Sequence, residues 1–256
     1  MINQYDVLTS FEMQNHQRAR STAGYTKRLA KNRIAKKSLA ASFREQLGGY
    51  LEDDSKVLEF GPGSVLYLYK VLGKFSRRVG EWTGVEIAPG NYHYIINHPI
   101  PENFRPLLGS ANDKLAIEPG SLDTVIFCCS HDSMMNFDEI SKNCYEYLKD
   151  EGKVILLQDL YPSTSTLRHL ANLDDRKVNL LGLDGCLTNV LINDNRVISS
   201  KEYLNDSVSG IFAQYGFKIE KNEYLSFPIL SSEADKAFIN RVQPYAFTLL
   251  TKYTTK

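Results

Sequence analysis

Long apolar runs are absent from this 256-residue sequence, and their absence excludes one large class of proteins. A membrane-spanning helix needs roughly 18 or more consecutive apolar residues, and no segment approaches that length. The opening residues, MINQYDVLTSFE, lack the basic start and apolar centre of a secretory signal. We therefore expect a cytoplasmic protein without membrane contact, long enough to form one large domain with its own core.

Cysteine is scarce, and the four cysteines lack the paired spacing of a zinc site. Two of them, Cys128 and Cys129, are adjacent within an apolar segment. Buried free cysteines of this kind are typical of proteins from a reducing compartment. We expect reduced thiols and no bound metal.

Net charge is also absent, because 30 basic residues balance 30 acidic ones. The first 44 residues carry nine basic and two acidic residues, whereas the remaining residues carry 21 and 28, so the two parts have net charges of +7 and −7. A neutral total disfavours a protein that coats nucleic acid over its whole surface. The split divides a basic N-terminal segment, residues 1–49, which we expect to be helical, from an acidic main domain over residues 50–256.

From residue 50 onward, short apolar segments alternate with segments of helical periodicity. This alternation predicts an α/β fold, with a parallel sheet and helices on both faces. We expect helices at residues 11–47, 64–75, 89 onward, 137–151 and 199–216. We expect strands at residues 56–60, 82–87, 107–108, 122–129, 153–158, 217–227 and 245–253. The third strand is expected to be short because the preceding residues, with Pro99, Pro101 and Pro106, predict irregular backbone.

The most informative segment is VLEFGPGSV at residues 57–65, where a strand leads into a glycine turn and then a helix. Gly61 and Gly63 allow the backbone to turn tightly and to approach a ligand closely. Glu86 ends the next strand, where a carboxylate can accept hydrogen bonds from two ribose hydroxyls. The alternative is that the glycines serve only a tight turn and that Glu86 is a solvated strand end.

Two common nucleotide-binding motifs are missing from this segment. A dinucleotide-binding loop would have a third glycine where Leu66 stands, and a phosphate-binding loop would end in Gly-Lys-Ser/Thr. Glu59, two residues before the first glycine, would repel a pyrophosphate and suits a cationic ligand. The pattern therefore predicts a nucleoside ligand that carries positive charge.

These residues resemble the first motif of the class I S-adenosylmethionine-dependent methyltransferases, E/D-x-G-x-G-x-G, from which Val65 departs at the last glycine. Glu86 resembles the ribose ligand of that family. Residues 109–123 resemble its third element, with Ser110 in place of the usual aspartate beside the adenine. The resemblance covers about residues 50–253 in the order of the elements.

The resemblance implies a Rossmann-like fold, a seven-stranded and mostly parallel sheet with helices on both faces and an antiparallel last strand. It also implies S-adenosyl-L-methionine as the cofactor. The cofactor contacts that it implies are Glu59, Gly61, Gly63, Glu86, Ser110, Ala111 and Cys129.

Candidate catalytic and substrate-binding residues follow from the strand ends and the covering segments. His131, after the fourth strand, is a candidate general base because its free pKa is near neutral; alternatively it caps the next helix. Asp159, at the end of the fifth strand, would orient the acceptor or a base, or else cap a turn. Arg168 would clamp an anionic acceptor or face solvent. The resemblance implies that residues 1–49 form an N-terminal cover over the cofactor. It also implies substrate contacts from this cover and from insertions at residues 160–198 and 226–244, with Tyr5, Tyr25, Tyr161 and Arg168 as the candidates.

The leading hypothesis is a methyltransferase that acts on an oxygen or nitrogen of a small molecule or short peptide, an anionic acceptor being one option. The absence of an N/D-P-P-Y/F motif, which marks many amino-methylating enzymes of nucleic acids and proteins, disfavours both of these acceptor classes. One alternative is an RNA methyltransferase that uses the basic residues 17–44 to bind phosphate. Another is a binding protein of the same fold that has lost catalysis. We expect a monomer or a homodimer.

Overall fold

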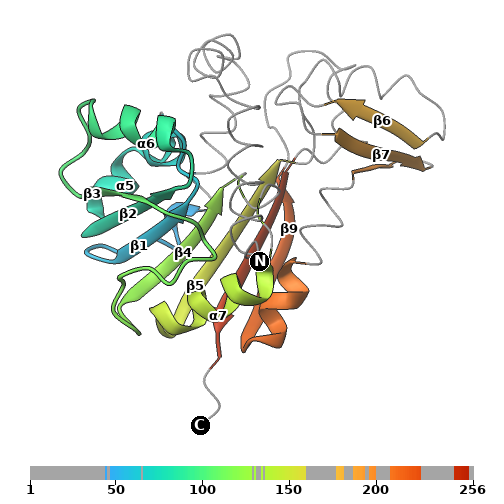
Figure 1. Ribbon diagram of the computed structural model, residues 1–256. Helices are drawn as coiled ribbons and strands as arrows, with labels where there is room; N and C mark the ends of the chain where they lie inside the picture. The colour runs from blue at the N-terminus through green and yellow to red at the C-terminus, as the bar shows by residue number, and fades with distance from the viewer. Residues whose placement is uncertain are drawn as a thin grey trace, which may run out of the picture.

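The computed structural model describes residues 44, 47–64, 66–128, 130, 134, 136–159, 177–181, 187–193, 196–199, 208–225 and 245–253. Its main feature is a seven-stranded sheet with helices packed against it (Figure 1). Most of the predicted helix at residues 11–47 lies outside the described residues. Of the predicted helix at residues 199–216, Ser199 instead ends a strand, residues 200–207 lie outside the described part, and residues 208–214 are helical.

The central sheet has the strand order β3-β2-β1-β4-β5-β10-β9. The first five strands in this order pair in parallel, and β10 runs antiparallel to both of its neighbours. This confirms the predicted mostly parallel sheet with an antiparallel last strand. The strands are β1 (Lys56–Phe60), β2 (Glu81–Glu86), β3 (Phe104–Leu108), β4 (Leu122–Cys128), β5 (Leu148–Asp159), β9 (Phe217–Leu225) and β10 (Tyr245–Lys252).

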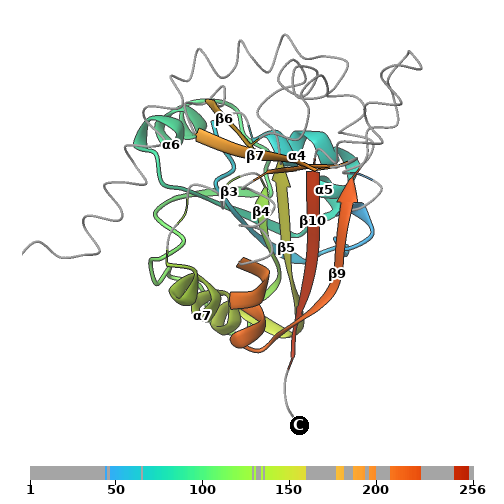
Figure 2. The same ribbon diagram turned by 90° about the vertical axis from the view of Figure 1, so that its right-hand side faces the viewer.

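Helices cover both faces of this sheet because successive strand residues point to opposite sides. On β1, Val57 belongs to one buried cluster and Leu58 to the other. The first cluster includes residues of α4 (Tyr67–Leu72) and α6 (Pro89–Ile96). The second includes residues of α7 (Phe137–Tyr147) and of the helical residues 208–214, which lie side by side in both views (Figures 1 and 2).

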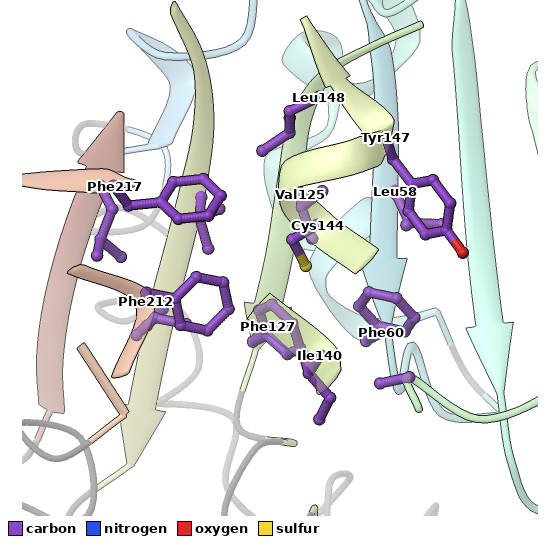
Figure 3. Close-up of a cluster of buried hydrophobic side chains, with 14 of the residues drawn as sticks. Leu58, Phe60, Val125, Phe127, Ile140, Cys144, Tyr147, Leu148, Phe212 and Phe217 are labelled. Atoms are coloured by element: carbon purple, nitrogen blue, oxygen red, sulfur yellow. The ribbon is translucent and has the colours of Figure 1, made fainter. Parts of the chain in front are cut away.

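The second cluster shows how strand and helix side chains interlock (Figure 3). Phe127 of β4 stacks on Phe60 of β1, with ring centroids 5.1 Å apart. Phe127 also meets Phe212 edge to face at 6.0 Å, and Phe212 is fully buried. Aromatic pairs of this kind add to the stabilisation that apolar burial provides. The cluster thereby fixes β1, which leads into the glycine loop, and β4 beside it.

The predicted helix at residues 64–75 is wrong in its bounds, because two positions interrupt it. Leu66 adopts the left-handed conformation, with φ 49° and ψ 55°, so α4 begins only at Tyr67. Gly73 has φ 61° and separates α4 from α5 (Lys74–Arg78). Helical periodicity alone does not reveal such left-handed residues, which end a helix locally.

The backbone before residue 107 was predicted to be irregular, but β3 runs through Pro106. Asn103 accepts a hydrogen bond from the backbone N–H of Trp82, and Gly109 donates one to Glu86. Odd-numbered residues of β3 therefore face β2, and Pro106 faces the free edge. Since β3 is an edge strand, the missing N–H of Pro106 breaks no ladder hydrogen bond.

A second, three-stranded antiparallel sheet lies within the segment that was assigned to a substrate-facing insertion. It comprises β6 (Lys177–Leu181), β7 (Leu187–Asn193) and β8 (Arg196–Ser199) in the order β6-β7-β8. Figures 1 and 2 place it beyond the carboxyl ends of the parallel strands. The sequence analysis predicted no strands in this segment.

Candidate functional site

The candidate site lies at the carboxyl end of β1, between β2 and β4. The chain passes from β1 to β2 on one side of β1, and β4 and β5 follow on its other side. The strand order thus reverses at β1, and open α/β sheets bind ligands outside the carboxyl ends of the strands at such a reversal. The loop after Phe60 crosses this point.

The glycine loop is fixed from both sides. The backbone N–H of Gly61, which has φ +73°, donates to the carbonyl of Val85 in β2 at 2.8 Å. On the β4 side, the Ser130 hydroxyl donates to the carbonyl of Phe60 at 2.7 Å. A Cβ on Gly61 would lie 2.7 Å from the Cβ of Ser130. Gly63 also has a positive φ, of 65°, so both glycines adopt conformations that other residues rarely take.

We predict that Gly61→Ala destabilises the fold by about 2–4 kcal/mol, because it combines a positive φ with overpacking against Ser130. Chemical denaturation measures this loss. The matched control is Gly90→Ala in α6, where an added Cβ meets nothing within 4 Å; it should change stability by no more than about 1 kcal/mol. Equal stability of the two variants would contradict the loop geometry.

Glu86 connects the glycine loop to the end of β2. Its side chain is 1% exposed. One carboxylate oxygen accepts a hydrogen bond from the backbone N–H of Gly63 at 3.1 Å, and the other accepts one from the N–H of Ala88 at 3.0 Å. A carboxylate has about four acceptor positions, so these bonds are compatible with further ones from a ligand.

Glu59 is equally buried but makes a different contact. Its carboxyl oxygen accepts a hydrogen bond from the indole N–H of Trp82 at 2.9 Å. Burial raises the pKa of Glu59 to about 8; the Trp82 hydrogen bond lowers this pKa, and the charge of Glu86 raises it. Glu59 is therefore mostly protonated near neutral pH, and a small decrease in its pKa would ionise it.

Ser64 ends the glycine loop with a buried hydroxyl. Its Oγ has no hydrogen-bond partner among the described residues, and the residue is 4% exposed. Leaving a buried polar group unpaired costs about 1–3 kcal/mol, and such a group calls for a partner in the form of water or a ligand. Together with the two glycines of positive φ, this hydroxyl fits a ligand-binding loop.

A second loop borders the site on the β3 side. The N–H of Gly109 donates to the carbonyl of Glu86 at 3.1 Å, so the loop begins beside the candidate ribose ligand. Ser110 donates its N–H to the Asp113 carboxylate at 2.7 Å, and Ala111 is buried in the second cluster. Glu86, Gly61, Gly63, Ser110 and Ala111 therefore come together at one edge of the sheet, with Glu59 on the adjoining face.

The remaining predicted site residues are not placed by the structure. Asp159 is the last residue of β5, at the same end of the sheet, but its side chain is outside the described part. The others lie wholly outside it: Tyr5, Tyr25, Cys129, His131, Tyr161 and Arg168. The sequence analysis missed the role of Ser130. Its place directly after β4 was a usable signal, because the carboxyl ends of neighbouring parallel strands meet.

A cleft of about 760 Å³ lies at the opposite, amino-terminal end of the parallel strands. Several of its charged side chains pair with one another, as in Lys149–Asp123 at 2.8 Å and Lys153–Glu52 at 2.9 Å. Because these charges are paired, the cleft favours neither an anionic nor a cationic ligand. We therefore place the functional site at the glycine loop. Within the described ranges, no three His, Cys, Asp or Glu side chains gather as a metal site would require.

No helix among the described residues is long and apolar enough to cross a membrane. No known family profile matches the sequence, and no curated protein is similar to it in sequence.

Solved structures do resemble the chain in fold. One is a protein from Listeria monocytogenes assigned as an S-adenosylmethionine-dependent methyltransferase, with a TM-score of 0.55, 16% identity, and coverage of 84% of this chain and 98% of that one. Another is a complex of the Trm112 methyltransferase activator of Haloferax volcanii with an assigned methyltransferase, with a TM-score of 0.58, 13% identity, and coverage of 88% and 96%. A third is the [4+2]-cyclase SpnF, with a TM-score of 0.54, 13% identity, and coverage of 83% and 81%.

These likenesses show a shared fold. The cyclase indicates that one fold carries more than one chemistry, so the reaction has to be argued from the site.

Proposed function

Because the chain has the fold of the class I S-adenosylmethionine-dependent methyltransferases, we propose that it is an enzyme that uses S-adenosyl-L-methionine as its cofactor. It transfers a methyl group to an oxygen or nitrogen of a small molecule or short peptide. The observation that carries the proposal is the contact between Glu86 and Gly63, in which a buried carboxylate at the end of β2 is fixed against the glycine loop.

Each described residue of the site has a role in holding the cofactor. Glu86 accepts hydrogen bonds from the two ribose hydroxyls, and its contacts with Gly63 and Ala88 orient it for this. Gly61 and Gly63 give the loop the positive-φ backbone of its tight turn, and the buried Ser64 hydroxyl faces a polar group of the cofactor. When bound, the cofactor supplies a methyl group on a positively charged sulfur. The chain positions the acceptor in line with that methyl group and excludes water.

The proposed catalytic and substrate-binding roles rest on the sequence. His131 removes the proton from an acceptor hydroxyl or amine, and Asp159 orients His131 or the acceptor. The proposed acceptor contacts are Tyr5, Tyr25, Tyr161 and Arg168. The net charge of +7 over residues 1–44 supports an anionic acceptor, because it would attract one to a site covered by this segment.

Calorimetric titration with S-adenosylhomocysteine, the demethylated product, tests the proposal. We expect saturable binding with a dissociation constant below about 100 μM and a rise in melting temperature, since a ligand that binds only the folded state stabilises it. Nicotinamide adenine dinucleotide is the control, because Leu66 stands where a dinucleotide-binding loop has its third glycine. The absence of any binding of S-adenosylhomocysteine at high micromolar concentration would overturn the proposal.

A second candidate function is RNA methylation, which one sequence observation favours. All nine basic residues of the first 44 fall between residues 18 and 44, and no acidic residue lies between residues 13 and 44. If this segment binds phosphate, RNA affinity should fall steeply with salt. Neutralising Lys31, Arg33, Lys36 and Lys37 should remove that dependence. If the chain instead binds the cofactor but methylates no acceptor of either class, a binding protein of the same fold is the better description.

A further inference from the structure

We propose that Asn143 of α7 is a positioning residue that holds the loop of residues 109–115 against the cofactor and thereby sets the selectivity for the nucleobase. This inference rests on the proposed function. It concerns a residue that contacts the backbone of this loop.

The contact is made by one buried side-chain amide. Asn143 is 5% exposed. Its Nδ2 donates toward three consecutive carbonyl oxygens, those of Ala111 at 3.4 Å, Asn112 at 3.4 Å and Asp113 at 3.3 Å. An amide NH₂ has only two hydrogens, so the three carbonyls share them. This single group therefore contributes to the orientation of all three peptide planes of residues 111–113.

Tyr147, one helical turn after Asn143, holds the next part of the loop. Its hydroxyl accepts a hydrogen bond from the N–H of Leu115 at 2.7 Å and donates toward the carbonyl of Asp113 at 3.5 Å. Residues four apart lie on the same face of a helix, so α7 presents both side chains to the loop. Figure 3 shows Tyr147 extending from α7 with its hydroxyl pointing away from the apolar side chains of the cluster.

The loop lies where a nucleobase would be. It begins at Gly109, whose N–H donates to the carbonyl of Glu86. A ribose held by the Glu86 carboxylate carries its base directly, so the base reaches the loop that follows the neighbouring strand β3. Ser110 is 3% exposed and its hydroxyl accepts the N–H of Asn112 at 3.2 Å. Ser110 is thus followed directly by residues 111–113, whose carbonyl groups Asn143 contacts.

This arrangement predicts selectivity as well as affinity. The loop has no regular secondary structure from residue 109 to residue 121. The directions of its hydrogen-bonding groups therefore depend on its contacts with the rest of the protein. A site with fixed hydrogen-bonding groups rejects an analogue that presents the wrong donors and acceptors, because its polar groups are left unpaired. If the Asn143 contact is lost, the loop adapts to either base and the discrimination falls.

The experiment compares S-adenosylhomocysteine with S-inosylhomocysteine, in which an oxygen replaces the exocyclic amine of the base. Dissociation constants for both are measured by calorimetry on the full chain. We expect the wild type to prefer the adenine compound by about 10-fold or more, and Asn143→Ala to reduce this preference to near onefold. The matched control is Ser141→Ala on the same helix. Ser141 is fully buried and its Oγ has no hydrogen-bond partner in the described part of the chain, so the preference should stay at the wild-type ratio.

The outcomes separate this inference from the proposed function. If the wild type does not bind S-adenosylhomocysteine, the proposed function fails and this inference fails with it. If the wild type binds it but shows no preference, or if folded Asn143→Ala keeps the wild-type ratio, only this inference is overturned. If Asn143→Ala does not fold, Tyr147→Phe decides by the same ratio, because it removes only the hydroxyl that accepts from Leu115.

Discussion

Replacing Glu86 by glutamine should weaken S-adenosylhomocysteine binding by on the order of 100-fold. Glutamine keeps the size of the side chain but loses the charge and one acceptor oxygen. Hydrogen bonds to a charged group contribute about 1.5–3 kcal/mol each, and the loss of about 3 kcal/mol corresponds to roughly 100-fold in affinity. The effect is amplified by the contacts of Glu86 with Gly63 and Ala88, because the amide NH₂ of glutamine would face one of these N–H groups.

The control for this prediction is Glu81→Gln at the start of the same strand. The Glu81 carboxylate is 40% exposed and lies 3.7 Å from Arg105, far along β2 from the glycine loop. Its replacement should leave the dissociation constant unchanged within twofold. Calorimetry on the three proteins, with circular dichroism to confirm folding, makes the comparison. If folded Glu86→Gln binds as tightly as the wild type, then Glu86 does not bind the ribose and the site must be placed elsewhere.

The strands β1, β2 and β4 were predictable because each is a short segment in which nearly every residue is buried. β5 begins at Leu148, within the segment predicted as helix. LDTVIFC at residues 122–128 has Val125, Ile126 and Phe127 fully buried in succession. Such a continuous apolar run is typical of a parallel strand that is buried on both faces. The glycine loop was predictable for a related reason. A tight turn between a strand and a helix needs residues with positive φ, and Gly61 and Gly63 supply them.

Contacts between distant parts of the chain could not be predicted. Asn143 contacts a loop about 30 residues earlier in the sequence, and Ser130 contacts Phe60 at a separation of 70 residues. Nothing in the local pattern marks an asparagine on a helix face as different from a solvated one. β3 was predicted too short for a similar reason, because Pro106 is tolerated only on an edge strand and the strand order decides which strands are edges.

Glu59→Gln should remove a pH dependence from the stability of the protein. The pKa of Glu59 is raised from 4.5 to about 8 by burial, so the folded state holds a proton that the unfolded chain releases. The free energy of unfolding therefore falls as the pH rises from about 4.5 to about 8, by up to about 1.4 kcal/mol for each pH unit. Glutamine resembles the protonated carboxyl and still offers an oxygen to the Trp82 indole N–H. At pH 5, the free energy of unfolding of the variant should not exceed that of the wild type. At pH 9, it should exceed that of the wild type by a few kcal/mol.

Urea denaturation of both proteins at several pH values measures this difference. The reference is Glu220→Gln, which removes an exposed carboxylate from the edge strand β9 and shows what the substitution does in water. A difference between Glu59→Gln and the wild type that stays constant from pH 5 to pH 9 would contradict the raised pKa.

The same variant also shows what the acid at position 59 is for. If glutamine makes the protein more stable at pH 9, stability does not explain the carboxyl, since a neutral isostere satisfies Trp82 at lower free-energy cost. A ligand with positive charge would favour the ionised form and so lower the pKa of Glu59 when it binds. S-adenosyl-L-methionine should then bind less tightly to Glu59→Gln than to the wild type. S-adenosylhomocysteine, which lacks the charge on sulfur, should lose less affinity, and equal losses would place Glu59 away from the sulfur.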